Sequence, residues 1–116
     1  MDKSYPAITA NLSVNLKTLR KNLPDVTQAF SGLAGAALRD GALDKKTKEL
    51  IALGIGISTR CDGCIGFHTE ALIKLGVTRE EFREVLGMAI YMGGGPSLMY
   101  AADAMAAFEQ FAPADA

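Results

Sequence analysis

Two thiols and one imidazole lie within eight residues of each other in this chain. Cys61, Cys64 and His68 are its only cysteines and its only histidine. On a helix, their spacings of three, four and seven residues would place all three side chains on one face. Two thiols this close can form a short disulfide or share a metal ion, and the imidazole can serve as a base. The pattern therefore indicates one chemical site.

Three interpretations of this cluster are open from the residues alone. The first is a dithiol/disulfide pair, with Cys61 near a helix N-terminus where the helix dipole and Arg60 favour the thiolate. The second is a metal site with Cys61, Cys64 and His68 as three ligands and an acidic residue as the fourth. Zinc sites usually show a further Cys/His pair, which the chain lacks. The third is a pair of buried cysteines acting as small apolar side chains.

The composition narrows the class of protein. The length of 116 residues, with 49% apolar residues, predicts one globular domain spanning residues 1–116. A net charge of −1 gives no basic surface for a nucleic acid. No apolar run is long enough to span a membrane, and no signal-peptide pattern follows the N-terminus. We therefore expect a cytoplasmic protein, where a close cysteine pair is more often redox-active or metal-binding than structural.

Helical spacing of apolar residues recurs along the chain. Thr78 and Glu81 form a capping-box pattern that begins one of the predicted helices. The predicted helices cover residues 8–22, 25–39, 45–60, 79–92 and 96–111.

Residues 51–58 are ambiguous, because large and small side chains alternate there with the period of a strand. Gly54 and Gly56 also lower helix propensity. No other segment reads as a convincing strand, so we predict a helix. It would be apolar on all sides and buried, with its glycines allowing close packing.

Glu49 does not stand out by spacing. It follows Lys45 by four residues, and its other neighbours include Lys46 and Lys48. The pattern alone favours a solvated helix face on which Lys45 pairs with Glu49.

A longer set of residues resembles a known family. Residues 48–53 (KELIAL), 60–69 (RCDGCIGFHT) and 76–81 (GVTREE) resemble the core of the AhpD-like alkylhydroperoxidase / carboxymuconolactone decarboxylase family. A CxxCxxxH element with a glutamate twelve residues upstream is typical of the AhpD-like branch. The resemblance implies an all-α bundle of about six helices, with the CxxC at the start of a central helix.

The resemblance also implies roles for four residues. Cys64 would attack a hydroperoxide and become a sulfenic acid, and Cys61 would resolve it as a disulfide. Glu49 and His68 would form a proton relay that activates the attacking thiol. Because the helix terminus favours Cys61 as the more exposed thiolate, Cys61 would exchange with the external reductant.

One residue departs from the family pattern. The best-studied peroxidase members carry a second histidine between the two cysteines, and Gly63 occupies that position here. Part of the relay is missing, which affects peroxidase activity more than dithiol chemistry. A redox-sensing or zinc-binding module, or a decarboxylase-like lyase on the same scaffold, remains an alternative.

The resemblance further implies the molecules with which the protein works. We expect a hydroperoxide substrate and an external dithiol or lipoyl-type reductant. No bound cofactor is required, since the cysteines carry the electrons. A homo-oligomer is expected, with a hexamer favoured over a trimer.

Overall fold

A computed structural model describes residues 3–113, which form six helices and no strand. The predicted domain also includes residues 1–2 and 114–116, which lie outside the described residues. The helices are α1 (Tyr5–Asn22), α2 (Pro24–Leu38), α3 (Lys45–Ser58), α4 (Asp62–Lys74), α5 (Arg79–Gly93) and α6 (Gly95–Phe111). The all-α prediction is confirmed, including the helix over the ambiguous residues 51–58.

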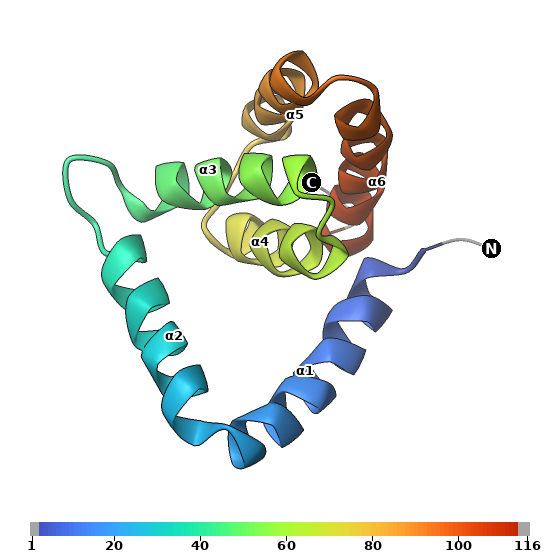
Figure 1. Ribbon diagram of the computed structural model, residues 1–116. Helices are drawn as coiled ribbons and strands as arrows, with labels where there is room; N and C mark the ends of the chain where they lie inside the picture. The colour runs from blue at the N-terminus through green and yellow to red at the C-terminus, as the bar shows by residue number, and fades with distance from the viewer. Residues whose placement is uncertain (1–2, 114–116) are drawn as a thin grey trace.

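The helices form a packed block and a projecting arm (Figure 1). In the block, α3 packs against α4 and α5, and α6 packs against α4 and α5. Helices α1 and α2 form a V that extends away from the block. Only the outer ends of the V meet the block, because α1 contacts α4 and α6 whereas α2 contacts α3. Among the helices of residues 3–113, none combines the length and apolarity needed to cross a membrane.

The core lies where α3, α4, α5 and α6 meet. The rings of Phe82 and Phe108 pack with their centroids 4.9 Å apart. The other large buried side chains include Leu53, Ile57, Ile65, Leu72 and Leu86. Burial of such side chains from water is the main force that holds the block together.

The strand-like alternation in α3 has a structural explanation. Leu53 and Ile57 point into the core, whereas Ile51 and Ile55 remain exposed on the opposite side of the helix. The prediction that this helix is buried on all sides is therefore wrong within one chain. This exposed apolar face of α3 borders a groove between α3 and α5.

The largest boundary error is at α1, which begins at Tyr5 instead of residue 8. The Ser4 hydroxyl caps this helix by accepting a hydrogen bond from the Ala7 amide, and Pro6 lies in the first turn. The amphipathic stripe starts only at Ile8, so it could not reveal this extra turn.

The predicted capping box of α5 is confirmed. The Thr78 hydroxyl accepts from the Glu81 amide at 3.0 Å, and a Glu81 carboxylate oxygen accepts from the Thr78 amide at 2.8 Å. The other Glu81 oxygen lies 2.9 Å from Lys46 Nζ. Glu81 thus joins the first turns of α3 and α5.

Acid should weaken the fold partly through Glu81. The hydrogen bond from the Thr78 amide, followed by the Lys46 ammonium, lowers the pKa of the Glu81 carboxyl below its ordinary value. Its stabilising contribution is therefore present above the unfolded-state pKa and is lost as the pH falls through the lower folded-state value. We expect Glu81→Gln to unfold at lower urea concentration at neutral pH, with the deficit shrinking in acid. Urea titrations across this range test the expectation, and an unchanging deficit would contradict it.

Candidate functional site

The first turn of α4 carries both cysteines. Cys61 is the N-cap residue, with extended backbone angles, and its sulfur accepts a hydrogen bond from the Cys64 amide at 3.1 Å. The preceding turn holds Arg60 in the left-handed region at φ 59°, and the Cys61 amide donates to the Gly56 carbonyl at 3.0 Å. A sulfur at this position lies in the positive field of the helix terminus, which favours a thiolate after reduction.

Cys61 and Cys64 are joined in a disulfide, with their Cα atoms 5.2 Å apart. That separation lies within the ordinary range for a disulfide. Both residues are half-buried, so the bond is near the surface without being fully exposed. The backbone geometry of this turn therefore suits a disulfide between these two cysteines close to the protein surface.

A glycine allows α3 to approach the cysteine pair. A Cβ atom added at Gly56 would lie 2.9 Å from Cys64 Cβ, closer than real side chains pack. Glu49, Leu53 and Gly56 share one face of α3, at spacings of four and three residues. Close packing at Gly56 therefore brings this whole face against α4.

Glu49 and His68 meet across this interface. His68 Nδ1 lies 3.1 Å from Glu49 Oε1. Glu49 is only 3% exposed, so the alternative of a solvated face with Lys45 is wrong. A buried carboxylate requires a partner, and the imidazole supplies it. The His68 side chain retains 29% exposure, so the pair reaches the surface through the imidazole.

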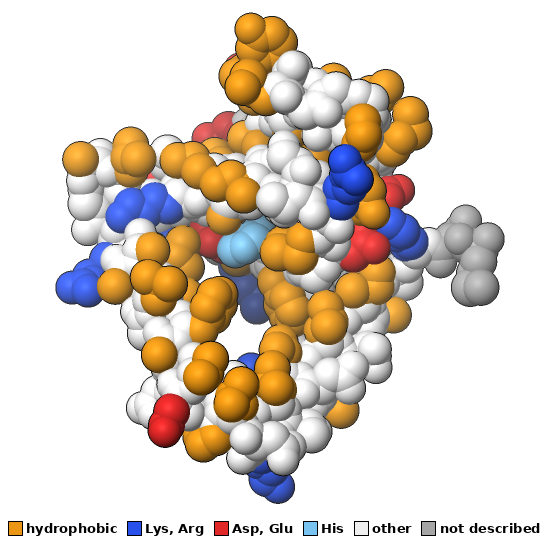
Figure 2. Space-filling view, in the orientation of Figure 1, with side chains coloured by type: hydrophobic (Ala, Val, Ile, Leu, Met, Phe, Trp, Pro, Cys, Tyr) orange, Lys and Arg blue, Asp and Glu red, His pale blue; other side chains and the backbone are white. Residues whose placement is uncertain are grey.

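The structure thus places the four predicted residues as two pairs on adjoining helices. His68 follows Cys64 by one turn of α4, and both lie on the side of α4 that faces α3. In Figure 2 the histidine, in pale blue, reaches the surface beside a hollow bordered by apolar side chains of the α1–α2 V.

Gly63 lies on a different side of α4. A Cβ atom at this position would come within 2.7 Å of Leu12 Cδ1 on α1. A larger residue at position 63 would therefore require the Leu12 side chain to move. The space beside Gly63 is occupied by an apolar side chain of α1.

Asp62, between the cysteines, belongs to a polar network that spacing did not reveal. Its Oδ1 accepts hydrogen bonds from the Tyr5 hydroxyl at 2.9 Å and from Lys3 Nζ at 3.1 Å. Lys3 also binds Asp103 on α6. These partners are distant in sequence, so no local pattern could have joined them.

Metal binding finds no support in the geometry of the oxidised site. Among residues 3–113, no group of three or more His, Cys, Asp or Glu residues is arranged to hold a metal ion. Both candidate sulfur ligands take part in the disulfide.

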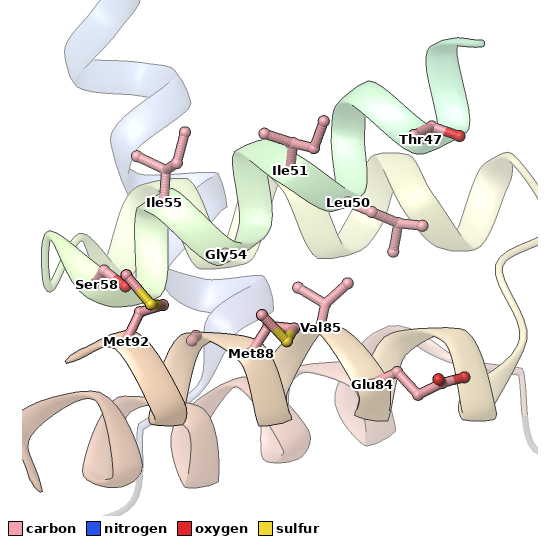
Figure 3. A pocket seen from close by; sticks show the side chains of 11 residues that line it. Thr47, Leu50, Ile51, Gly54, Ile55, Ser58, Glu84, Val85, Met88 and Met92 are labelled. Carbon is pink, nitrogen blue, oxygen red and sulfur yellow. The ribbon is translucent and has the colours of Figure 1, made fainter. Parts of the chain in front are cut away.

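A second concave surface lies between α3 and α5 (Figure 3). It is an open groove with a volume of about 560 Å³. Ile51 and Ile55 line it from α3, and Val85, Met88 and Met92 line it from α5. None of the four predicted site residues lines this groove.

Comparisons with known proteins agree with this architecture. Residues 24–107 match the carboxymuconolactone decarboxylase family. An uncharacterized protein of Cupriavidus necator is 44% identical over 86 residues, which cover 74% of this chain and 76% of that protein.

Two crystal structures are similar over most of the chain. The apo form of a carboxymuconolactone decarboxylase family protein from Legionella pneumophila is 54% identical, with a TM-score of 0.93, covering 97% of this chain and all of that one. A family protein from Thermotoga maritima, for which involvement in an antioxidative response has been suggested, is 33% identical with a TM-score of 0.74. That match covers 93% of this chain and 89% of the other. With its fold, its matched residues and these relatives in agreement, the chain belongs to the carboxymuconolactone decarboxylase family, which includes the AhpD-like proteins.

Proposed function

We propose that this protein is a thiol-dependent oxidoreductase that reduces organic hydroperoxides through Cys61 and Cys64. The observation that carries the proposal is the disulfide at the start of α4, on a helix whose next turn presents His68 bound to Glu49. The suggested antioxidative role of the Thermotoga relative supports the same direction.

The reaction begins with proton transfer from Cys64. When neutral His68 donates its Nδ1–H to Glu49, its Nε2 carries the lone pair and can take the thiol proton. The Cys64 thiolate then attacks the terminal oxygen of the hydroperoxide and breaks the O–O bond. The alkoxide leaves with a proton as an alcohol, and Cys64 becomes a sulfenic acid.

Cys61 completes the oxidative half of the cycle. Its thiolate attacks the Cys64 sulfur, forms the disulfide and releases water. In total, one hydroperoxide and two thiols give one alcohol, one water and one disulfide. An external dithiol or lipoyl-type carrier then attacks Cys61 and restores both thiols, becoming a disulfide itself. The half-buried position of Cys61 at the helix end supports this exchange.

A redox-sensing dithiol is the second candidate function, and Gly63 favours it. Peroxidase relatives have a second histidine there, whereas Leu12 fills the adjoining space here. Such a sensor would exchange with disulfides but would react slowly with hydroperoxides.

We also propose that the protein is a homo-oligomer, with a hexamer favoured over a trimer. Helix α2 has no buried residue, and its apolar stripe of Val26, Phe30 and Leu33 is exposed in a single chain. The groove between α3 and α5 exposes a second apolar surface. Exposed apolar surfaces of this kind often mark contacts between proteins.

Thiol counting tests the assignment of the cysteines. Reduced wild-type protein treated with one equivalent of organic hydroperoxide should lose two thiols and release one alcohol. Cys64→Ser should lose none, because the attacking sulfur is absent. Cys61→Ser should stop at a sulfenic acid that a diketone reagent traps. Loss of the single remaining thiol in Cys64→Ser at the wild-type rate would refute the attack by Cys64. Ready exchange with disulfides, without peroxide reaction, would favour the sensor.

The proton relay is tested by removing its members. Replacing His68 with Gln should lower the second-order rate of peroxide reaction at neutral pH by roughly 100-fold, a typical contribution of a general base. Glu49→Gln should lower it by a smaller factor, because the imidazole loses the partner that orients it. The deficit should shrink at alkaline pH, where the thiol ionises without help. Glu70→Gln, on the same helix as His68, is the matched control and should leave the rate unchanged. A pH-independent deficit would argue against a proton-transfer role.

Light scattering after size-exclusion chromatography tests the oligomer. Wild-type protein should have the mass of a hexamer, and Phe30→Glu should dissociate it because a charge replaces an exposed apolar side chain of α2. Gln28→Glu adds the same charge to the same helix at another exposed position and should preserve the assembly. Equal dissociation by both variants would indicate general charge repulsion instead of an apolar contact.

A further inference from the structure

The side of α4 that faces away from α3 packs against α1. A Cβ atom at Gly66 would lie 2.6 Å from Thr9 Cγ2 and 3.5 Å from Tyr5 Cδ1, so the two helices meet closely here. Asp62 precedes Gly66 by four residues and shares its side of α4. Since consecutive helical residues are about 100° apart, Asp62 and Cys64 project from nearly opposite sides of the helix.

The Asp62 carboxylate is held on this side by two donors. Its Oδ1 accepts from the Tyr5 hydroxyl at 2.9 Å and from Lys3 Nζ at 3.1 Å. Lys3 is shared, because the same ammonium lies 2.9 Å from Asp103 Oδ2 and 4.9 Å from the centre of the Tyr100 ring. The Lys3 ammonium thus binds both Asp62 and Asp103. Within this network, the Tyr5 hydroxyl donates to Asp62 alone.

Tyr5 is a fixed donor. Its side chain is fully buried, and its amide donates to Gln110 Oε1 at 2.8 Å. The Gln110 side-chain Nε2 in turn donates to the Lys3 backbone carbonyl at 2.9 Å. Burial, followed by the hydrogen bond to Asp62, raises the pKa of Tyr5 above its ordinary value. The phenol therefore keeps its proton over the pH range in which thiols titrate.

A free carboxylate at this place would work against the cysteines. Asp62 is the first residue of α4, directly after Cys61. Negative charge near a thiol disfavours the thiolate and opposes the effect of the helix dipole. Other charged or titratable groups near this turn include Lys3, Asp103 and Tyr100 on the α1 and α6 side, Arg60 directly before Cys61, and Glu49 and His68 on the α3 side.

We propose that Tyr5 is a positioning residue of the dithiol site, whose hydroxyl holds the Asp62 carboxylate on the α1 side of α4 and away from the two sulfurs. The role rests on the proposed dithiol function. Tyr5 would affect how easily Cys61 forms a thiolate and would not touch the hydroperoxide. The same role would therefore apply in a redox sensor.

Thiolate titration tests this role without any substrate. In the Cys64→Ser background only Cys61 titrates as a thiol, and its thiolate is followed by ultraviolet absorbance and by alkylation rate. Adding Tyr5→Phe should raise the midpoint pH by roughly half a unit, about a threefold loss of thiolate at neutral pH. Adding Asp62→Asn as well should abolish the rise, because no carboxylate is left to approach the sulfur.

Tyr100→Phe is the matched control. It removes a hydroxyl from the same network but keeps the ring that Lys3 contacts, so the midpoint should not move. An unchanged midpoint in Tyr5→Phe, or an equal rise when Asp62 is already Asn, would overturn the proposal.

A second measurement applies even if Tyr5→Phe fails to fold. In the Cys64→Ser background with Tyr5 in place, Asp62→Asn should lower the midpoint pH of Cys61 by less than about 0.3 units. The change is small because the carboxylate is already held away from the sulfur. A drop of about one unit would show that the charge reaches the thiol despite Tyr5, and would overturn the proposal. Because no hydroperoxide is used, failure of the peroxidase function and failure of this role are separate results.

Discussion

The close contact between α3 and α4 at Gly56 is the constraint on which the candidate site depends. A Cβ atom at Gly56 would lie 2.9 Å from Cys64 Cβ, so only glycine lets the helices meet at this distance. One face of α3 carries Gly56, Leu53 and Glu49 toward α4. The same approach that packs Leu53 in the core therefore brings Glu49 within 3.1 Å of His68. The absence of a side chain at Gly56 thus positions the Glu49–His68 pair two turns away.

Helix α4 carries its thiol and imidazole groups on one side and the Asp62 carboxylate on the other. Toward α3 it presents Cys64 and His68, and toward α1 and α6 it presents Asp62 to Tyr5 and Lys3. The two sides need different surroundings, because a thiolate gains from positive potential while a carboxylate would oppose it. Buried partners on each side keep these groups apart. The first turn of α4 is therefore anchored from both directions.

The sequence allowed correct prediction of features that depend on neighbours along the chain. The helices, the Thr78–Glu81 capping box and the grouping of the cysteines with His68 follow from spacing. Glu49 could not be assigned by spacing, because its lysine neighbours fit a solvated face equally well, and only the family resemblance singled it out. The bond between Tyr5 and Asp62 joins residues 57 positions apart, so it depends on tertiary packing that no local pattern describes.

Helix α2 is weakly packed within one chain and also borders the hollow beside His68. It has 15 residues and no buried side chain, and isolated helices of that length are marginal in water. Its stripe of Val26, Phe30 and Leu33 is exposed, so packing within one chain adds little to the stability of this helix. The α1–α2 V also borders the hollow beside the histidine (Figure 2). Covering α2 in the proposed homo-oligomer would thus fix the wall of this hollow, and the same apolar contacts would stabilise the arm and limit water around the imidazole.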